Sequence, residues 1–330
     1  MNKWSGVLLS GALALAVQSA SASTETYYQC TPSGCSPQNT VSVSSHYDAT
    51  RYPVVLVHGL FGAGSYLGIL DYFYQIPQGL AGNGARVFIP QVSAANATSV
   101  RGEQLLTQVQ YVLAITGAGK VNLIGHSQGG PTARYVAGVA PQLIASVSTV
   151  AGVNKGSAVA DAIEGVTDVI GPLGTSVVTS IVNAFSGLID PSEGQNSQAA
   201  LQDLTTAGTA QFNKQFPGGV PGTACGSGSA TYQGVRYYSW SGNAASTGNV
   251  TNVFDPSDAI MALGNLAFFG TANDGLVASC SSHLGVVIRD IYYQNHLDEV
   301  NQLVGLISPF TTSPVTLFEN QANRLVQAGL

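Results

Sequence analysis

Charge is scarce in this sequence. Asp, Glu, Lys and Arg make up only 8% of its 330 residues, the net charge is −6, and no run of basic residues occurs. Binding to a nucleic acid needs a basic surface, so the composition argues against a nucleic-acid partner. The net negative charge also offers no electrostatic attraction to an acidic substrate. Hydrophobic residues account for 45% of the chain, enough for a large buried core.

Internal repeats and low-complexity linkers are also missing. A chain of this length without such dividers fits one large domain. We predict that domain over residues 51–330, preceded by a signal peptide over residues 1–22 and an N-terminal extension over residues 23–50.

The first 22 residues have the pattern of a secretory signal. Lys3 precedes an apolar stretch from Val7 to Val17, and small residues follow at 20–22. The apolar stretch is too short to span a bilayer. We therefore predict export, without stable insertion in a membrane.

Zinc-type spacings of cysteine and histidine are absent, although the exported part holds four cysteines. Disulfides are the expected state of such cysteines in an oxidising compartment. Three pairings are possible, and the economical one joins the neighbours Cys30 and Cys35 and leaves Cys225 for Cys280. The longer bridge would stabilise the fold by about 4 kcal/mol through loop closure in the unfolded chain.

Short apolar runs alternate with segments of helical periodicity in the first half of the domain. Strands are predicted at Tyr52–His58, Arg86–Pro90, Lys120–Gly125 and Ala145–Val150, and helices at Gly102–Thr116 and Pro131–Val139. This alternation predicts βαβ units and an α/β fold with a mostly parallel sheet flanked by helices.

The third strand ends in the sequence GHSQG, residues 125–129, which matches the G-x-S-x-G nucleophile elbow. A serine on a sharp strand-to-helix turn adopts strained dihedrals, so the residues two before and two after it must lack side chains. The helix that begins near Gly129 favours negative charge at its N-terminus. Ser127 is therefore the candidate nucleophile, with an ordinary glycine turn as the alternative.

A serine nucleophile needs a histidine base, which in this fold lies last along the chain. Only His283 and His296 follow Ser127. His296 comes after a strand-like aromatic run over residues 286–293, where a loop leaves the sheet edge. His283 lies three residues after Cys280, in a loop that a disulfide would tether, so we favour His296.

The acid that orients the base is less well determined. Asp274 lies in a turn next to a strand-like segment, but the aspartates at 255, 258, 290 and 298 compete with it. Spacing alone does not choose among them.

Two backbone N–H groups must stabilise the oxyanion. We expect one from Gln128, directly after the nucleophile, and the other from Leu60 in the sequence HGLFG, residues 58–62. His58 is expected to fix this loop by hydrogen bonds rather than to react.

Several long motifs carry a family resemblance from about Tyr52 to the C-terminus. They are YPVVLVHGLFG, RGEQLL, KVNLIGHSQGG, DPSDA, TANDGLV, CSSHLG and NHLDEVNQ. The chain resembles the true lipases of Pseudomonas and Burkholderia, bacterial lipase family I, subfamilies 1 and 2. This resemblance implies the α/β-hydrolase fold and triacylglycerol hydrolysis, with Ser127 as nucleophile, Asp274 as acid and His296 as base.

The resemblance further implies one structural Ca²⁺ ion. Asp255 and Asp298 would supply carboxylates, and Gln302 and Leu306 backbone carbonyls; such hard oxygen ligands suit calcium. Because Asp298 lies two residues after His296, the ion would brace the loop that carries the base.

The same resemblance implies the disulfide Cys225–Cys280, whereas Cys30 and Cys35 lie outside the matched region. It also implies a membrane-anchored, lipase-specific foldase as a partner in the periplasm, before secretion across the outer membrane.

One motif departs from the family. Its usual Gly-Thr/Ala-Pro-His-Lys/Arg-Gly-Ser run reads AGVNKGS over residues 151–157, so that Val153 and Asn154 replace Pro-His. The resemblance therefore does not predict the geometry of this loop, whereas its assignment of the catalytic residues is unaffected.

No charged residue occurs between Asp168 and Asp190. Within this stretch the apolar residues at 177, 178, 181, 182, 185, 188 and 189 share one helical face, and Ser, Thr and Asn occupy the other. A core helix is one interpretation. We favour a lid within residues 160–195 that opens at a lipid interface.

Together these features predict a secreted triacylglycerol lipase that acts through an acyl-enzyme on acylglycerols at lipid–water interfaces. A soluble carboxylesterase without interfacial activation is one alternative. A catalytically inactive binding protein on the same fold is another, although it would need a broken triad, and the motifs show none.

Overall fold

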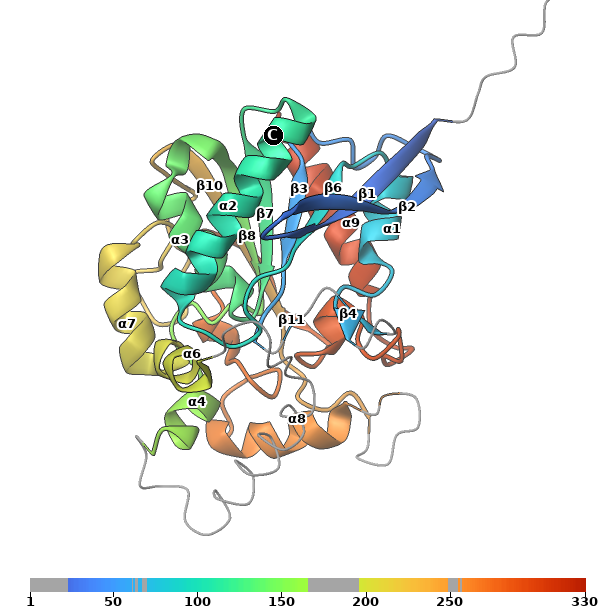
Figure 1. Cartoon of the computed structure of the whole chain (residues 1–330). Helices are drawn as coiled ribbons and strands as arrows, with labels where there is room; N and C mark the ends of the chain where they lie inside the picture. Colours follow the sequence, from blue (N-terminus) through green and yellow to red (C-terminus); the bar gives the residue numbers. More distant parts are fainter. Residues whose placement is uncertain are drawn as a thin grey trace, which may run out of the picture.

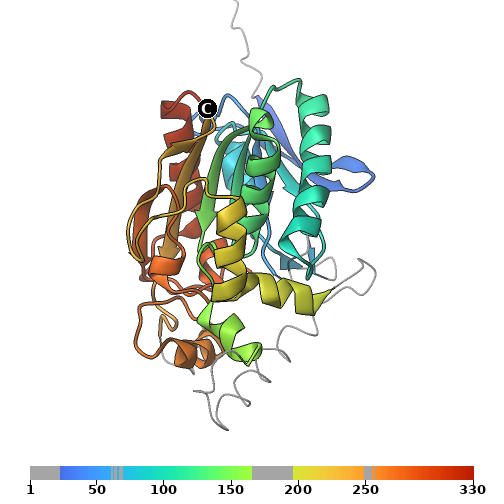
Figure 2. The same ribbon diagram turned by 90° about the vertical axis from the view of Figure 1, so that its left-hand side faces the viewer.

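A twisted sheet with helices on both faces forms the centre of the molecule (Figures 1 and 2). The computed structural model describes residues 23–60, 62, 65–66, 70–165, 196–248, 255 and 257–330. The predicted signal peptide and the helical face over residues 177–189 lie outside the described residues. Within them, no helix is both long and apolar enough to cross a membrane.

The strands follow the order β11-β10-β8-β7-β3-β6-β1-β2, in which β1 is Thr24–Thr31 and β2 is Gly34–Ser42, and β9 pairs with β10 beside this path. The bounds are β3 Val54–Val57, β6 Val87–Pro90, β7 Val121–His126, β8 Ile144–Val150, β9 Thr231–Tyr232, β10 Val235–Gly242 and β11 Val286–Tyr292. A separate pair joins β4 (Ser65–Tyr66) to β5 (Leu70–Asp71). Neighbours from β6 to β11 pair in parallel, so the predicted α/β class is confirmed.

Strand β3 separates two hydrophobic cores. Val54 and Leu56 pack with residues of α1 (Ile76–Gly82) and α9 (Pro314–Gln327) on one face. Val55 and Val57 pack with residues of α2 (Thr98–Thr116) and α3 (Gly129–Val139) on the other. Successive side chains of a strand point to opposite faces, so a continuous apolar run is what a doubly covered strand requires.

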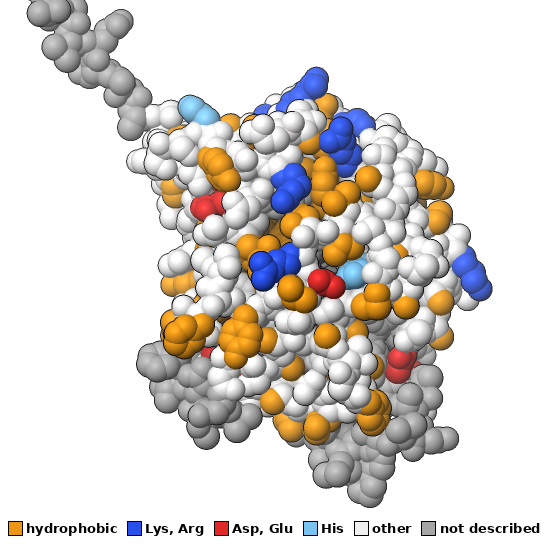
Figure 3. Space-filling view, turned by 180° about the vertical axis from the view of Figure 1, so that it is seen from behind, with side chains coloured by type: hydrophobic (Ala, Val, Ile, Leu, Met, Phe, Trp, Pro, Cys, Tyr) orange, Lys and Arg blue, Asp and Glu red, His pale blue; other side chains and the backbone are white. Residues whose placement is uncertain are grey.

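Shorter helices gather near the carboxyl ends of the central strands (Figure 1). They are α4 Ala158–Ile163, α6 Ser197–Leu204, α7 Thr206–Gln215 and α8 Asp258–Asn265. Single 3₁₀ turns span Pro141–Leu143, Leu266–Phe268, Ser279–Ser281 and Asp298–Val300. The few charged side chains visible on the back of the molecule are scattered among polar and apolar ones (Figure 3).

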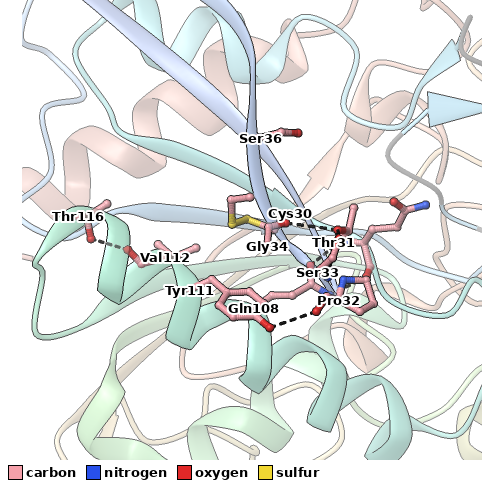
Figure 4. The surroundings of a disulfide bond; sticks show 12 residues. Cys30, Thr31, Pro32, Ser33, Gly34, Ser36, Gln108, Tyr111, Val112 and Thr116 are labelled. Atoms are coloured by element: carbon pink, nitrogen blue, oxygen red, sulfur yellow. Dashed lines mark hydrogen bonds between the residues drawn. A yellow bond between two sulfur atoms is a disulfide. The ribbon is translucent and has the colours of Figure 1, made fainter.

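The segment over residues 23–50 differs from the extension expected of it, because two of its strands belong to the central sheet. β1 (Thr24–Thr31) and β2 (Gly34–Ser42) form a hairpin, and β1 pairs in parallel with β6. The disulfide Cys30–Cys35 joins register partners at the hairpin end, and Tyr111 of α2 donates a hydrogen bond to the carbonyl of Pro32 at 3.1 Å (Figure 4). The hairpin therefore extends the hydrolase sheet by two strands.

The second disulfide joins Cys225 to Cys280, as the pairing argument and the family resemblance both predicted. It ties the segment before β9 to the 3₁₀ turn that precedes β11. No free cysteine remains.

Candidate active site

Ser127 lies on a sharp turn between β7 and α3, with a left-handed φ of 55°. A Cβ at Gly125 would stand 2.2 Å from the carbonyl oxygen of Gly129, and a Cβ at Gly129 would stand 2.2 Å from that of Val57. Both glycines are therefore required by close backbone approach. The strained φ of a non-glycine residue here is maintained by the surrounding structure, including the hydrogen bond from Ser127 N–H to Val150 O at 3.0 Å.

His296 and Asp274 form a buried pair. Nδ1 of His296 lies 2.8 Å from Oδ2 of Asp274, and the His296 N–H donates to the Asp274 carbonyl at 2.9 Å. The other carboxylate oxygen accepts from the N–H groups of Leu276 and Val277 at 2.9 and 2.7 Å. Because the carboxylate accepts from Nδ1, the proton resides there and Nε2 keeps its lone pair for base chemistry.

The competing candidates are occupied elsewhere. His283 places its Nε2 2.9 Å from Asp290 and its Nδ1 3.0 Å from the carbonyl of Gly226, next to the Cys225–Cys280 disulfide. Asp255, Asp258 and Asp298 belong to a cluster around Asn295. The structure therefore brings His296 to Asp274 and leaves the alternatives outside this pair.

The elbow lies against both the histidine loop and the loop after β3. The ring of His126, the residue before Ser127, has its centroid 4.5 Å from that of His296. On the other loop, a Cβ at Gly59 would stand only 2.6 Å from the Cβ of Ser127. The predicted oxyanion loop therefore lies against the predicted nucleophile, and the ring of the predicted base lies against that of the residue before the nucleophile.

The orientation of the Leu60 N–H follows from its peptide bond. The Gly59 carbonyl accepts hydrogen bonds from Nδ1 of His58 at 3.0 Å and from the N–H of Gly62 at 3.2 Å. A trans peptide directs its C=O and N–H to opposite sides, so the Leu60 N–H points away from His58. The side chain of Gln128 is fully buried and donates to the Asn96 carbonyl at 2.9 Å.

His58 has the structural role expected of it. Its Nε2 accepts from the Val92 N–H at 3.3 Å, which leaves Nδ1 as the donor to Gly59 O. Complete burial, with the Arg101 guanidinium nearby, lowers the pKa of His58 to about 3. Arg101 is itself fully buried and donates to the His58 carbonyl at 2.5 Å, a contact that the RGEQLL motif alone did not reveal.

An acidic cluster lies beside the histidine loop. Asp255 accepts from the hydroxyls of Thr247 and Ser257, both at 2.6 Å, and Asp258 accepts from the Thr247 N–H at 2.8 Å. Asp298 accepts from the Asn295 N–H at 3.0 Å through Oδ2, while its Oδ1 is buried without a hydrogen-bond partner. Burial and the neighbouring Asp255 carboxylate raise the pKa of Asp298 to about 9.

This cluster has the donor chemistry of a calcium site. The ion pairs in the described residues involve only the carboxylates of Asp274 and Asp290, so no basic side chain compensates the cluster there. The described part holds no group of three or more His, Cys, Asp or Glu side chains arranged for a metal, but the predicted set needs only two carboxylates and two carbonyls. The orphaned oxygen of Asp298 fits a cation at this position.

The departure from the family motif is accommodated by hydrogen bonds. Asn154 is fully buried, and its Nδ2 donates to Thr149 Oγ1 at 3.1 Å and to the Ser282 carbonyl at 2.9 Å. Its own carbonyl accepts from the Asn213 side chain at 2.9 Å. The asparagine therefore ties the loop after β8 to two other segments.

The α/β-hydrolase fold family matches residues 52–171. A triacylglycerol lipase of Vibrio cholerae is 55% identical over 86% of this chain and 90% of its own length. The chain belongs to the triacylglycerol lipase family. A triacylglycerol lipase of Burkholderia plantarii is 44% identical over 86% of this chain and 88% of its own length, in agreement with the resemblance seen in the motifs.

Solved structures share the fold at lower identity. A mature lipase of Bacillus licheniformis aligns over 78% of this chain and 89% of its own, with a TM-score of 0.55 and 19% identity. EstA of Clostridium botulinum aligns over 84% and 87%, with a TM-score of 0.56 and 17% identity. At this identity the likeness concerns the fold alone.

Proposed function

We propose that this protein is a secreted triacylglycerol lipase that uses Ser127, His296 and Asp274 as its catalytic triad. The observation that carries the proposal is the buried hydrogen bond from His296 to Asp274, beside a strained serine elbow. Membership of the lipase family supports acylglycerols as the substrate class.

Nε2 of His296 takes the hydroxyl proton of Ser127 as Oγ attacks the ester carbonyl. The negative charge that develops on the carbonyl oxygen is stabilised by the N–H groups of Leu60 and Gln128. The protonated imidazole then gives its proton to the leaving alcohol, and an acyl-enzyme remains on Oγ. Water, deprotonated by the same nitrogen, attacks the acyl carbonyl; the bond to Oγ then breaks, Oγ takes the proton back from the imidazole, and the fatty acid is released. Asp274 holds the imidazole in the tautomer that both steps require.

We also propose that Asp255 and Asp298, with the carbonyls of Gln302 and Leu306, hold one structural Ca²⁺. Support comes from the buried, uncompensated carboxylates and from the unpartnered Oδ1 of Asp298. When bound, the ion would neutralise these charges and stabilise the turn that follows His296; no proton transfer involves it.

Export through the periplasm, folding with a dedicated foldase, and a lid within residues 160–195 complete the proposal. The signal-like N-terminus supports export, and the uncharged amphipathic stretch supports the lid. The foldase rests on the family resemblance.

Hydrolysis of tributyrin, measured below and above its solubility limit, tests this function. A lipase should show a steep rise in rate once droplets form, whereas a soluble carboxylesterase should saturate before that point. Ser127→Ala should abolish both rates and prevent labelling by a serine-directed phosphonate. A wild-type protein that neither hydrolyses esters nor reacts with the phosphonate would be a binding protein.

A further inference from the structure

A chain of three hydrogen bonds connects the oxyanion loop to the histidine loop. The N–H of Gly59 lies 3.0 Å from the hydroxyl of Tyr72, and that hydroxyl lies 2.6 Å from Nδ1 of His126. Nε2 of His126 lies 3.0 Å from the backbone carbonyl of His296. The mechanism above uses neither Tyr72 nor the side chain of His126, although both are buried beside the triad.

The chemistry of the two ends fixes the direction of every bond. The His296 carbonyl can only accept, so Nε2 of His126 must carry a proton. Burial lowers the pKa of His126 well below its usual value, so the ring is neutral and its Nδ1 is an acceptor. The Tyr72 hydroxyl therefore donates to Nδ1 and accepts from the Gly59 N–H. Each hydrogen-bond donor in the chain thus faces one acceptor, and the Tyr72 hydroxyl and the His126 ring each donate one bond and accept one.

The position of this chain connects two catalytic groups. Gly59 directly precedes Leu60, whose N–H is the proposed oxyanion donor, and His296 is the proposed base. His126 directly precedes the nucleophile. Small displacements between such groups lower the reaction rate strongly, because the oxyanion donors and the base must both be aligned with the substrate when charge develops.

We propose that Tyr72 and His126 are positioning residues, which act as one unit to hold the oxyanion loop and the catalytic histidine in register across the nucleophile elbow. This inference rests on the proposed function, since it concerns the same site. It differs from a packing role in one respect: the effects of the two residues on the chemical step must be coupled.

Two substitutions interrupt the chain at different links. Tyr72→Phe removes the hydroxyl and so loses the bonds to Gly59 and His126. His126→Asn keeps an acceptor for Tyr72 in its amide oxygen and loses the donor to His296. The kcat and KM for the dissolved ester p-nitrophenyl butyrate should be measured for the mature protein, both single variants and the double variant. Tyr237→Phe, at another buried tyrosine near the start of β10, is the matched control.

Each single variant should lower kcat by about 10-fold with KM little changed. The kcat of the double variant should be no more than about twofold below that of the slower single variant. Either substitution alone already interrupts the chain, so the second has little left to remove. Losses that multiply to about 100-fold in the double variant would overturn the proposal, and so would an unchanged kcat in Tyr72→Phe or an equal loss in Tyr237→Phe.

A spectroscopic test needs no variant to fold. In ¹⁵N-labelled wild-type protein, the neutral ring of His126 should carry its proton on Nε2, with slow solvent exchange. A proton on Nδ1 would leave the lone pair of Nε2 facing the His296 carbonyl oxygen, which breaks the chain and refutes the inference. Because this measurement is independent of turnover, it distinguishes the two failures: the expected tautomer in a protein that hydrolyses no ester would refute the proposed function and leave the hydrogen-bond chain intact, whereas the other tautomer in an active lipase would refute the chain alone.

Discussion

The carboxylate of Asp298 accepts a hydrogen bond from the backbone N–H of Asn295 at 3.0 Å, which closes a tight turn around His296. A second bond runs back from the Asp298 N–H to the Asn295 side chain at 3.1 Å. The proposed calcium ligand and the proposed base therefore belong to one small hydrogen-bonded turn.

Removal of calcium should consequently loosen the base. We expect a chelator to lower the unfolding temperature and the kcat together, and Ca²⁺ to restore both. An ion present at about 100 times its Kd would contribute about 2.7 kcal/mol to the free energy of unfolding. Differential scanning calorimetry with and without the chelator measures this.

Asp298→Asn should remove most of this calcium dependence, since it deletes one of the two carboxylate ligands. Asp290→Asn is the matched control, because Asp290 pairs with His283 outside the cluster. Equal unfolding temperatures with and without chelator in the wild-type protein would refute the calcium proposal.

The pair of His296 and Asp274 gives a second prediction. Asp274→Asn would keep the shape of the side chain but present an amide N–H or a neutral oxygen to Nδ1, which favours the wrong tautomer of the base. In the serine-protease triad the equivalent change costs about 10⁴-fold in kcat, and we expect a loss of about 10³–10⁴-fold here. Steady-state kinetics on p-nitrophenyl butyrate measures it. The control Asp290→Asn should change kcat less than twofold. A near wild-type kcat in Asp274→Asn would show that Asp274 is not the acid of the triad.

The elbow gives a third prediction. Gly129→Ala would place a Cβ against the carbonyl of Val57, so we expect it to destabilise the fold by about 1–3 kcal/mol or more and to displace Ser127. Gly119→Ala is the control, since a Cβ there meets no atom within 4 Å. Its effect should stay within about 0.5 kcal/mol. Urea unfolding compares the two, and equal stabilities would contradict the steric account of the G-x-S-x-G motif.

The parts of the fold that were predicted from sequence are those set by local pattern. The run at β3 is continuous and apolar because both faces of the strand are covered, and the elbow motif needs only its own glycines. The predicted bounds differ from the observed ones by a few residues, as for α2, which begins at Thr98 rather than Gly102.

Contacts between distant segments could not be read in this way. Tyr72 lies 54 positions from His126 in the sequence, and nothing in the neighbourhood of either residue marks it as a partner of the other. The pairing of Asp274 with His296 is likewise a tertiary contact. Among the candidate aspartates, only the family motif pointed to Asp274. The sequence does not reveal that the hairpin of β1 and β2 belongs to the central sheet, because its pairing with β6 joins segments about 60 residues apart.

Asp48 gives a fourth prediction, which concerns stability rather than catalysis. Its side chain is fully buried, and neither carboxylate oxygen has a hydrogen-bond partner among the described residues. Burial, together with the nearby Glu319 carboxylate, raises the pKa of Asp48 to about 8. In the unfolded chain the group titrates near pH 4.

The folded state therefore binds this proton more tightly than the unfolded state does, so its contribution is fully present below about pH 4 and is lost as the pH rises toward 8. The amide in Asp48→Asn cannot ionise, so this variant should not lose stability in this way as the pH rises. We expect the variant to exceed the wild type in free energy of unfolding by at least about 1 kcal/mol at pH 9, with a much smaller difference at pH 5. Guanidinium unfolding at both pH values measures this. A wild type that is as stable as Asp48→Asn at pH 9 would mean that the buried carboxylate is compensated in the folded protein.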